Sequence, residues 1–115
     1  MAFTDVELQR YEEAVGHFID KRRPAEDIRD QVDLSFRIEG QSVIIFELRS
    51  KWSQRDIKRE IPIAKATFVQ TTKTWKLYWQ PSDLKWHAYQ PAPETRTIEE
   101  FLTIVDEDKC ACFWG

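Results

Sequence analysis

The residues best suited to chemistry are cations and aromatic rings that alternate along the middle of the chain. Between Trp75 and Tyr89 lie five of the eight Trp and Tyr residues, interspersed with Lys76, Lys85 and His87. Basic side chains neutralise phosphates and rings stack on bases, so this mixture suits a single-stranded nucleic acid. The candidate residues for binding nucleic acid or another anionic partner are Arg37, Arg49, Lys65, Lys76, Tyr78, Lys85, His87 and Tyr89.

The charge distribution permits a plainer interpretation. Residues 1–32 hold eight acids and five bases, residues 33–90 hold six acids and ten bases, and residues 91–115 hold six acids and two bases. A positive middle between negative ends indicates either a surface for anions or pairing of helix acids with sheet bases. The net charge of −3 argues against a dedicated nucleic-acid binder, which is usually basic.

Two acidic residues resemble part of a nuclease site. Asp33 is followed by Glu47, with Arg49 two residues beyond, which is similar to the Asp…Glu-x-Lys arrangement of PD-(D/E)xK nucleases. There, two carboxylates hold Mg²⁺ and a lysine acts on the attacking water. Arg49 departs from the pattern because an arginine stays protonated and cannot exchange protons as lysine does. A metal-dependent nuclease with Asp33 and Glu47 as ligands is the alternative hypothesis.

The two cysteines, Cys110 and Cys112, stand two residues apart. Together with His87 they offer few ligands for a soft metal, whereas a structural zinc site requires four. Free cysteine is among the most buried residue types, so packing of a reduced pair in the core is favoured. With three glycines in the chain there is no glycine-rich phosphate loop, and no nucleophile has a recognisable base nearby. The sequence therefore indicates no cofactor and favours a binding module over an enzyme.

A third hypothesis is a protein-interaction or homodimer module. Val43 and Ile45 are expected on the sheet face away from the helices, where they would join Tyr78 and Tyr89 in an apolar patch. This hypothesis competes with nucleic-acid binding because both use the same face. Salt separates them, since only phosphate contacts weaken steeply as salt rises.

Two capped helices are predicted to position these residues. Thr4 and Glu7 have the spacing of a capping box, an apolar stripe follows, and Pro24 ends the pattern. Thr97 and Glu100 repeat the signal before a second stripe. The apolar residues of the two stripes are Leu8, Tyr11, Val15, Phe18 and Ile19, then Ile98, Phe101, Leu102 and Val105.

Five alternating segments between the helices predict antiparallel strands at 32–39, 43–49, 62–68, 75–80 and 84–89. In the last three strands the residues expected to face the helices are Ala64, Ala66 and Phe68, then Trp75, Leu77 and Trp79, then Leu84, Trp86 and Ala88. The residues expected to point outward include Lys65, Lys76, Tyr78, Lys85, His87 and Tyr89. In the second strand the inward residues are expected to be Ile44, Phe46 and Leu48.

The segments outside the predicted helices and strands also have recognisable sequence patterns. Residues 50–60 lack a clean period, which predicts a long charged loop, and Pro62 suits an edge or bulge position. The apolar residues 110–115 are expected to dock as a strand or clamp.

Together these signals predict one domain over residues 1–115 with an α+β fold. It comprises an N-terminal helix, a five-stranded antiparallel β-meander, a C-terminal helix and an apolar tail, with both helices on one face of the sheet. No segment has the length and apolarity of a membrane span, so a cytoplasmic location without membrane association is expected.

Several short pieces spread over nearly the whole chain match a known family. They are Arg22-Arg23-Pro24, Ile38-Glu39-Gly40, Phe46-Glu47, Ala64-Lys65-Ala66-Thr67, Trp75-Lys76-Leu77-Tyr78-Trp79, Leu84-Lys85-Trp86-His87 and the closing Cys-Phe-Trp-Gly. In these pieces the chain resembles the small domain-of-unknown-function family 3024. The resemblance implies a bacterial, single-domain protein and supplies no activity, ligand or catalytic residue.

Overall fold

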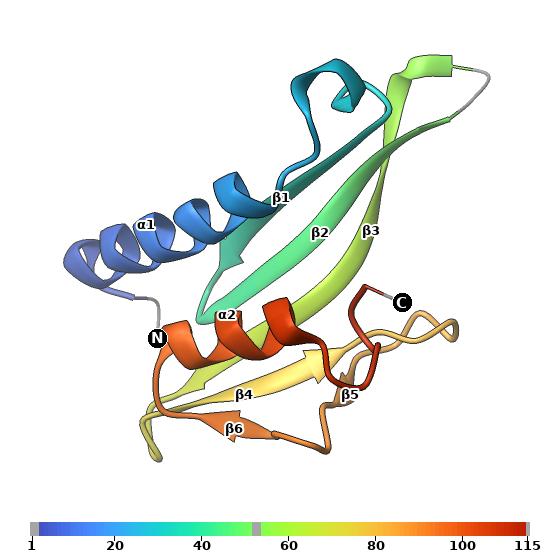
Figure 1. Ribbon diagram of the computed structural model, residues 1–115. Helices are drawn as coiled ribbons and strands as arrows, with labels where there is room; N and C mark the ends of the chain where they lie inside the picture. Colours follow the sequence, from blue (N-terminus) through green and yellow to red (C-terminus); the bar gives the residue numbers. More distant parts are fainter. Residues whose placement is uncertain (1–2, 52–53, 115) are drawn as a thin grey trace.

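The computed structural model describes the backbone of residues 3–51 and 54–114 and the side chains of residues 3–50 and 59–114. It is an α+β fold in which the described strands form an antiparallel sheet (Figure 1). The strand order is β1-β2-β3-β4-β5, and β6 pairs with β4. The elements are α1 (Asp5–Arg22), the 3-10 helix η1 (Glu26–Ile28), β1 (Val32–Glu39), β2 (Ser42–Lys51), β3 (Gln54–Val69), β4 (Thr74–Trp79), β5 (His87–Ala88), β6 (Glu94–Thr95) and α2 (Ile98–Glu107).

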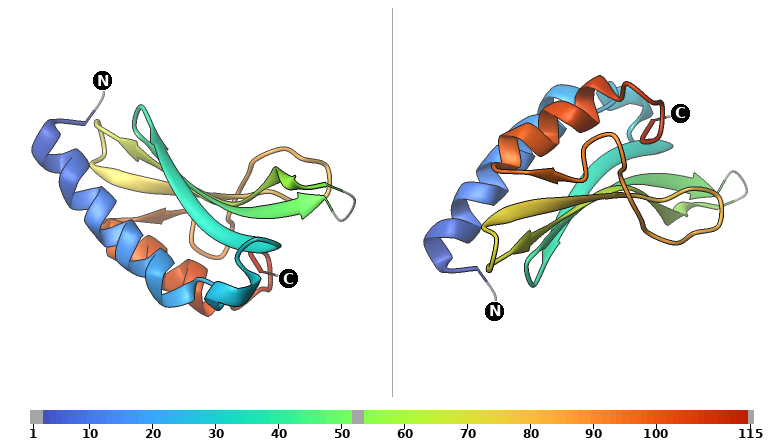
Figure 2. Two further views of the ribbon diagram at one scale, coloured as in Figure 1. Left: turned by 90° about the horizontal axis from the view of Figure 1, so that it is seen from above. Right: turned by 90° about the horizontal axis from the view of Figure 1, so that it is seen from below.

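Both α-helices begin at the predicted caps and cover one face of the sheet (Figure 2). Thr4 and Glu7 form the full capping box, in which the Thr4 hydroxyl accepts from the Glu7 amide at 3.2 Å and the Glu7 carboxylate accepts from the Thr4 amide at 3.0 Å. The Thr97 hydroxyl accepts from the Glu100 amide at 3.2 Å. No helix in the described part of the chain has the length and apolar character needed to cross a membrane.

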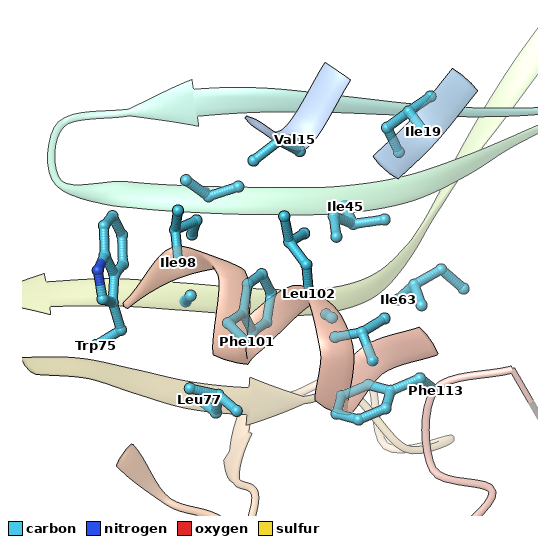
Figure 3. Packing of buried hydrophobic residues seen from close by; sticks show 14 of the residues in the cluster. Val15, Ile19, Ile45, Ile63, Trp75, Leu77, Ile98, Phe101, Leu102 and Phe113 are labelled. Atoms are coloured by element: carbon cyan, nitrogen blue, oxygen red, sulfur yellow. The ribbon is translucent and has the colours of Figure 1, made fainter. Parts of the chain in front are cut away.

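The core lies between this helix layer and the sheet (Figure 3). Val15 of α1 and Phe101 of α2 are fully buried against it. From the sheet, Trp75 and Leu77 of β4 face inward, as predicted, and so do Ala64 and Ala66 of β3. The two alanines are fully buried, and their small side chains leave room for α2, which contacts β3.

The predicted orientation of β2 is wrong. Val43 and Ile45 are fully buried in the core beneath the helices, while Ile44 and Phe46 lie on the opposite face. Four apolar residues follow one another here, so alternation within the strand carries no information about which face is inward. Pairing decides it, because Val43 stands opposite Ala66 and strand partners share a face.

Residues 50–60 are not the long loop that their composition predicts. β2 continues to Lys51 and β3 begins at Gln54, so most of this segment extends a hairpin. Residues 52–53, which also fall in the predicted loop, lie outside the described residues. Pro62 is at a register shift, as predicted: Ile45 pairs with Ala64 and Phe46 with Pro62, which leaves Ile63 as the extra residue.

The fifth strand is shorter than predicted and presents the opposite parity. It comprises His87–Ala88, and His87 pairs with Trp79 on the helix side of the sheet. Tyr89 follows it into the core at 2% exposure, whereas Leu84, predicted to face inward, is 77% exposed at a φ of 63°. The turn extends over 80–86 instead of three residues, and a shift of one position reverses every side chain.

The C-terminal tail docks as a clamp. Phe113 is buried, with its ring centroid 4.8 Å from that of Tyr89, and the Trp114 indole donates to the Val105 carbonyl at 2.8 Å. Cys112 packs partly against the core, but Cys110 is exposed, so the prediction that both cysteines are core residues is wrong for Cys110. Residue 115 lies outside the described part of the chain.

Candidate binding surface on the sheet

The sheet face away from the helices carries a continuous row of side chains across five strands. Arg37 of β1 pairs with Ile44 of β2, which pairs with Lys65 of β3, which pairs with Tyr78 of β4, opposite Ala88 of β5. Directly opposed residues share a face, so these five side chains lie on one side. We call this side the outer face; it also includes Phe46, Thr67, Lys76 and Trp86.

Lys65 is held between two rings at the centre of the outer face. Its Nζ lies 4.9 Å from the ring centroid of Tyr78 and 5.0 Å from that of Trp86. Both distances suit cation–π attraction, which strengthens as water is excluded. Burial lowers the pKa of Lys65, although nearby Glu39 acts in the opposite direction. The site therefore combines a partly desolvated cation with two half-buried rings.

Trp86 is the site residue that the sequence analysis misses. It was expected to face the core, because the fifth strand was given the wrong parity. The aromatic residues of β4 do not reveal which face Trp86 occupies, because Tyr78 lies on the outer face and Trp79 on the helix side. Its contact with Lys65 depends on the seven-residue turn before β5, which sequence spacing does not reveal.

Two predicted lysines extend the cationic surface. Lys76 is exposed on the outer face, where it pairs across the sheet with Thr67 and Glu94. Lys85 is exposed in the turn next to Trp86. Lys65 is the predicted cation that contacts the two rings. Lys76 lies on the same face two residues before Tyr78, and Lys85 directly precedes Trp86 in the chain.

Arg37 lies on the same face, but its charge is matched internally. Its Nε donates to Glu39 Oε1 at 2.5 Å and its Nη1 to Glu60 Oε1 at 2.6 Å, while the guanidinium lies 5.0 Å from the Phe46 ring centroid. The hydrogen bond to Glu60, followed by the one to Glu39, raises the pKa of Arg37 despite partial burial. Arg37 is thus better suited to covering Phe46 than to capturing a phosphate.

The other three predicted ligand residues are elsewhere. Arg49 pairs with Val32 on the helix side of the sheet and donates to Glu47 at 3.2 Å. His87 also lies on that side, beside Trp79, with its Nε2 2.7 Å from Asp83 Oδ2. Tyr89 is buried, and burial together with a hydrogen bond to Cys110 raises its pKa to about 12. The expectation that Tyr89 is exposed is wrong.

The two carboxylates of the nuclease hypothesis do not meet. Asp33 pairs with Leu48 and Glu47 pairs with Leu34, so adjacent positions of β1 direct them to opposite faces. Asp33 also accepts two hydrogen bonds from Arg23, which lower its pKa. Among the described side chains, those of residues 3–50 and 59–114, no group of three or more His, Cys, Asp or Glu residues is placed to hold a metal.

A separate groove of about 600 Å³ lies between the two helices. Phe18 of α1 and Leu102 of α2 line it, and Arg22 donates across it to Asp106 at 2.7 Å. Arg10 and Glu99 form a second ion pair between the helices at 2.6 Å. These two ion pairs neutralise charged side chains on both helices that form the groove, so the groove is less suited to an anion than the outer face.

No curated protein and no solved structure is significantly similar to this chain. A family model matches residues 3–115, and the chain therefore belongs to the family described as "Domain of unknown function (DUF3024)".

Proposed function

We propose that the outer face binds single-stranded nucleic acid without catalysis. In this proposal Lys65, Lys76 and Lys85 neutralise phosphates, and the rings of Tyr78 and Trp86 stack on bases. The observation that carries the proposal is the position of Lys65 between two rings, on a sheet face that neither described α-helix covers. Stacking on aromatic rings beside a cationic track is the general mode of sequence-tolerant single-strand binding.

The lysines and the aromatic rings are expected to contribute to binding in different, separately measurable ways. Phosphate contacts make affinity depend on salt, with a slope near −0.7 per neutralised phosphate on single strands. Three lysines then predict a roughly twentyfold loss of affinity between 50 and 200 mM salt. Each stacked base contributes about 1–3 kcal/mol, equivalent to at least a fivefold change in affinity.

The test is fluorescence anisotropy of a labelled single-stranded oligonucleotide of mixed sequence at those two salt concentrations. The double variant Lys76→Glu and Lys85→Glu should weaken binding at least about tenfold and flatten the salt dependence. The matched control, Lys21→Glu with Lys109→Glu, makes the same charge change away from the outer face and should bind within about twofold of wild type.

Substitutions of the Tyr78 ring provide the second part of this binding test. Tyr78→Ala should lose about fivefold in affinity, whereas Tyr78→Phe keeps the ring and should stay near wild type. No binding at the lower salt concentration, or binding that ignores both the lysine variants and salt, contradicts the proposal. A protein partner held by an apolar surface would show little salt dependence, so the same titration separates the two classes.

A further inference from the structure

The segment after α2 forms a small closed loop. Asp108 ends the helix with a φ of 43°, and its carboxylate accepts from the amides of Phe113 at 3.1 Å and Trp114 at 2.9 Å. Trp114 also donates to Val105, and the Arg22 guanidinium lies 4.1 Å from its ring centroid. The residues between Asp108 and Phe113 are therefore anchored at both ends.

Both cysteines lie inside this loop. Cys110 is exposed and Cys112 is half-buried, and Cys112 Sγ lies 3.7 Å from the carbonyl oxygen of Cys110. Ala111 between them has a φ of 54°, in the left-handed region that non-glycine residues rarely adopt. A left-handed turn at Ala111 brings the Cα atoms of Cys110 and Cys112 to roughly 5.5 Å, within the Cα range of disulfides. The two side chains must still rotate toward each other before their sulfur atoms can bond.

We propose that Cys110 and Cys112 form a reversible thiol–disulfide site that exchanges with a low-molecular-weight disulfide such as oxidised glutathione. The Cys110 thiolate attacks one sulfur of the external disulfide and releases one small thiol, leaving a mixed disulfide. The Cys112 sulfur then attacks the Cys110 sulfur and releases the second small thiol. The two cysteines lose two electrons and two protons, and the external disulfide gains both.

The surroundings favour Cys110 as the attacking group. It is exposed, and an accessible thiol reacts faster than a shielded one. Burial raises the pKa of Cys112, and the charges of Cys110 and Asp108 add to the effect, so Cys112 stays protonated longer. A hollow of about 220 Å³ adjoins this region, because its lining includes Lys109, the residue before Cys110, together with Tyr89 and Ile104. It offers space for part of the incoming molecule.

The test is intact-mass measurement after incubation with oxidised glutathione, with and without later reduction. Wild type should lose the mass of two hydrogen atoms, lose both reactive thiols and recover them on reduction. Cys112→Ser should stop at a mixed disulfide on Cys110. Cys110→Ser should react roughly tenfold more slowly, because the half-buried thiol must then attack first.

The rate of disulfide formation in the folded and in the unfolded chain shows whether the fold brings the two thiols together or whether their closeness in sequence is sufficient. The folded protein should form the internal disulfide at least about tenfold faster than the same chain in urea, because the loop holds the thiols together. Equal rates in the two states would overturn the proposal. So would a folded protein that accumulates mixed disulfides without an internal one, or that forms dimers linked through Cys110.

Discussion

Asp33 accepts two hydrogen bonds from one guanidinium, from Arg23 Nε at 2.9 Å and from Arg23 Nη2 at 2.7 Å. The pair joins the residue that caps the C-terminus of α1 to the start of β1. Asp33 is 13% exposed and Arg23 31%, so water screens the contact less than at an open surface. A residue with the spacing of a metal ligand is thereby committed to holding a helix against a strand.

Asp33→Asn should therefore destabilise the protein. Loss of a charge-assisted hydrogen bond in a partly buried site costs about 1.5–3 kcal/mol of unfolding free energy, measurable by urea denaturation at pH 7. Arg23 lowers the pKa of Asp33, so this contribution is full above the unfolded value near 3.9 and disappears as pH falls through the lower folded pKa.

The control for Asp33 is Glu47→Gln. Its partner Arg49 is 51% exposed, and the change should stay within about 0.5 kcal/mol. If the difference between wild type and Asp33→Asn persisted unchanged at pH 2, the ion pair would not be its source.

Lys65→Met should separate binding from stability. Burial disfavours the charged ammonium, and methionine fills similar space between the rings, so unfolding free energy should fall by no more than about 0.5 kcal/mol. Oligonucleotide affinity should nevertheless decrease at least about threefold, because one phosphate partner is lost.

Leu77→Ala provides the opposite result for comparison. Leu77 is fully buried on the core side of the same sheet, and its truncation should cost about 2–5 kcal/mol. A Lys65→Met protein as unstable as Leu77→Ala would show that Lys65 is needed for folding and not only for binding.

Tyr89 should make the protein sensitive to alkali. Burial, and then the hydrogen bond to Cys110, raise its pKa to about 12, whereas an unfolded tyrosine ionises near 10. Only the unfolded state releases the proton between these values, so unfolding free energy should decrease as pH rises from 10 to 12, by roughly 2 kcal/mol. Denaturation across this pH range, with tyrosinate absorbance recorded in parallel, measures it.

Tyr89→Phe removes the ionising group and should flatten that part of the pH profile. The Phe113 contact depends on the ring and is retained. An unchanged slope in Tyr89→Phe would assign the alkaline transition to other groups.

Ala66→Leu tests the close approach of α2 to the sheet. Ala66 is fully buried, and a larger side chain there should strain the packing and cost about 1–3 kcal/mol in thermal or urea unfolding. Lys76→Leu adds an apolar side chain to the exposed side of the sheet and should change stability by less than about 0.5 kcal/mol. Equal effects of the two would mean that the space above Ala66 is not filled.

Features set by neighbouring residues were predicted correctly from the sequence. The Thr4 and Thr97 caps need partners three residues away, and the inward parity of Trp75 and Leu77 needs alternation within one strand. Local spacing contains that information. The α+β class and the position of both helices on one face follow from two amphipathic stripes and an antiparallel sheet.

Features set by pairing could not be predicted in the same way. The orientation of Ile45 depends on its register with Ala64, and that of Trp86 depends on the length of the turn before β5. Neither the strand register nor the length of this turn can be deduced from residues that are close together in the sequence. The cluster around Lys65 was therefore only half predicted: Lys65 and Tyr78 were correctly placed together, whereas Trp86 and Tyr89 were exchanged between the two faces.

The length of β3 has a consequence for self-association. In the described pairings, β4 covers only residues 64–69 of β3, which begins at Gln54. The first part of this strand thus offers backbone donors and acceptors along one margin without a described neighbour, and an extended chain could continue the ladder there. Pro62 interrupts that margin because it lacks an amide hydrogen, which is how natural sheets discourage unwanted growth. Replacing this proline would remove a safeguard against aggregation while leaving the core intact.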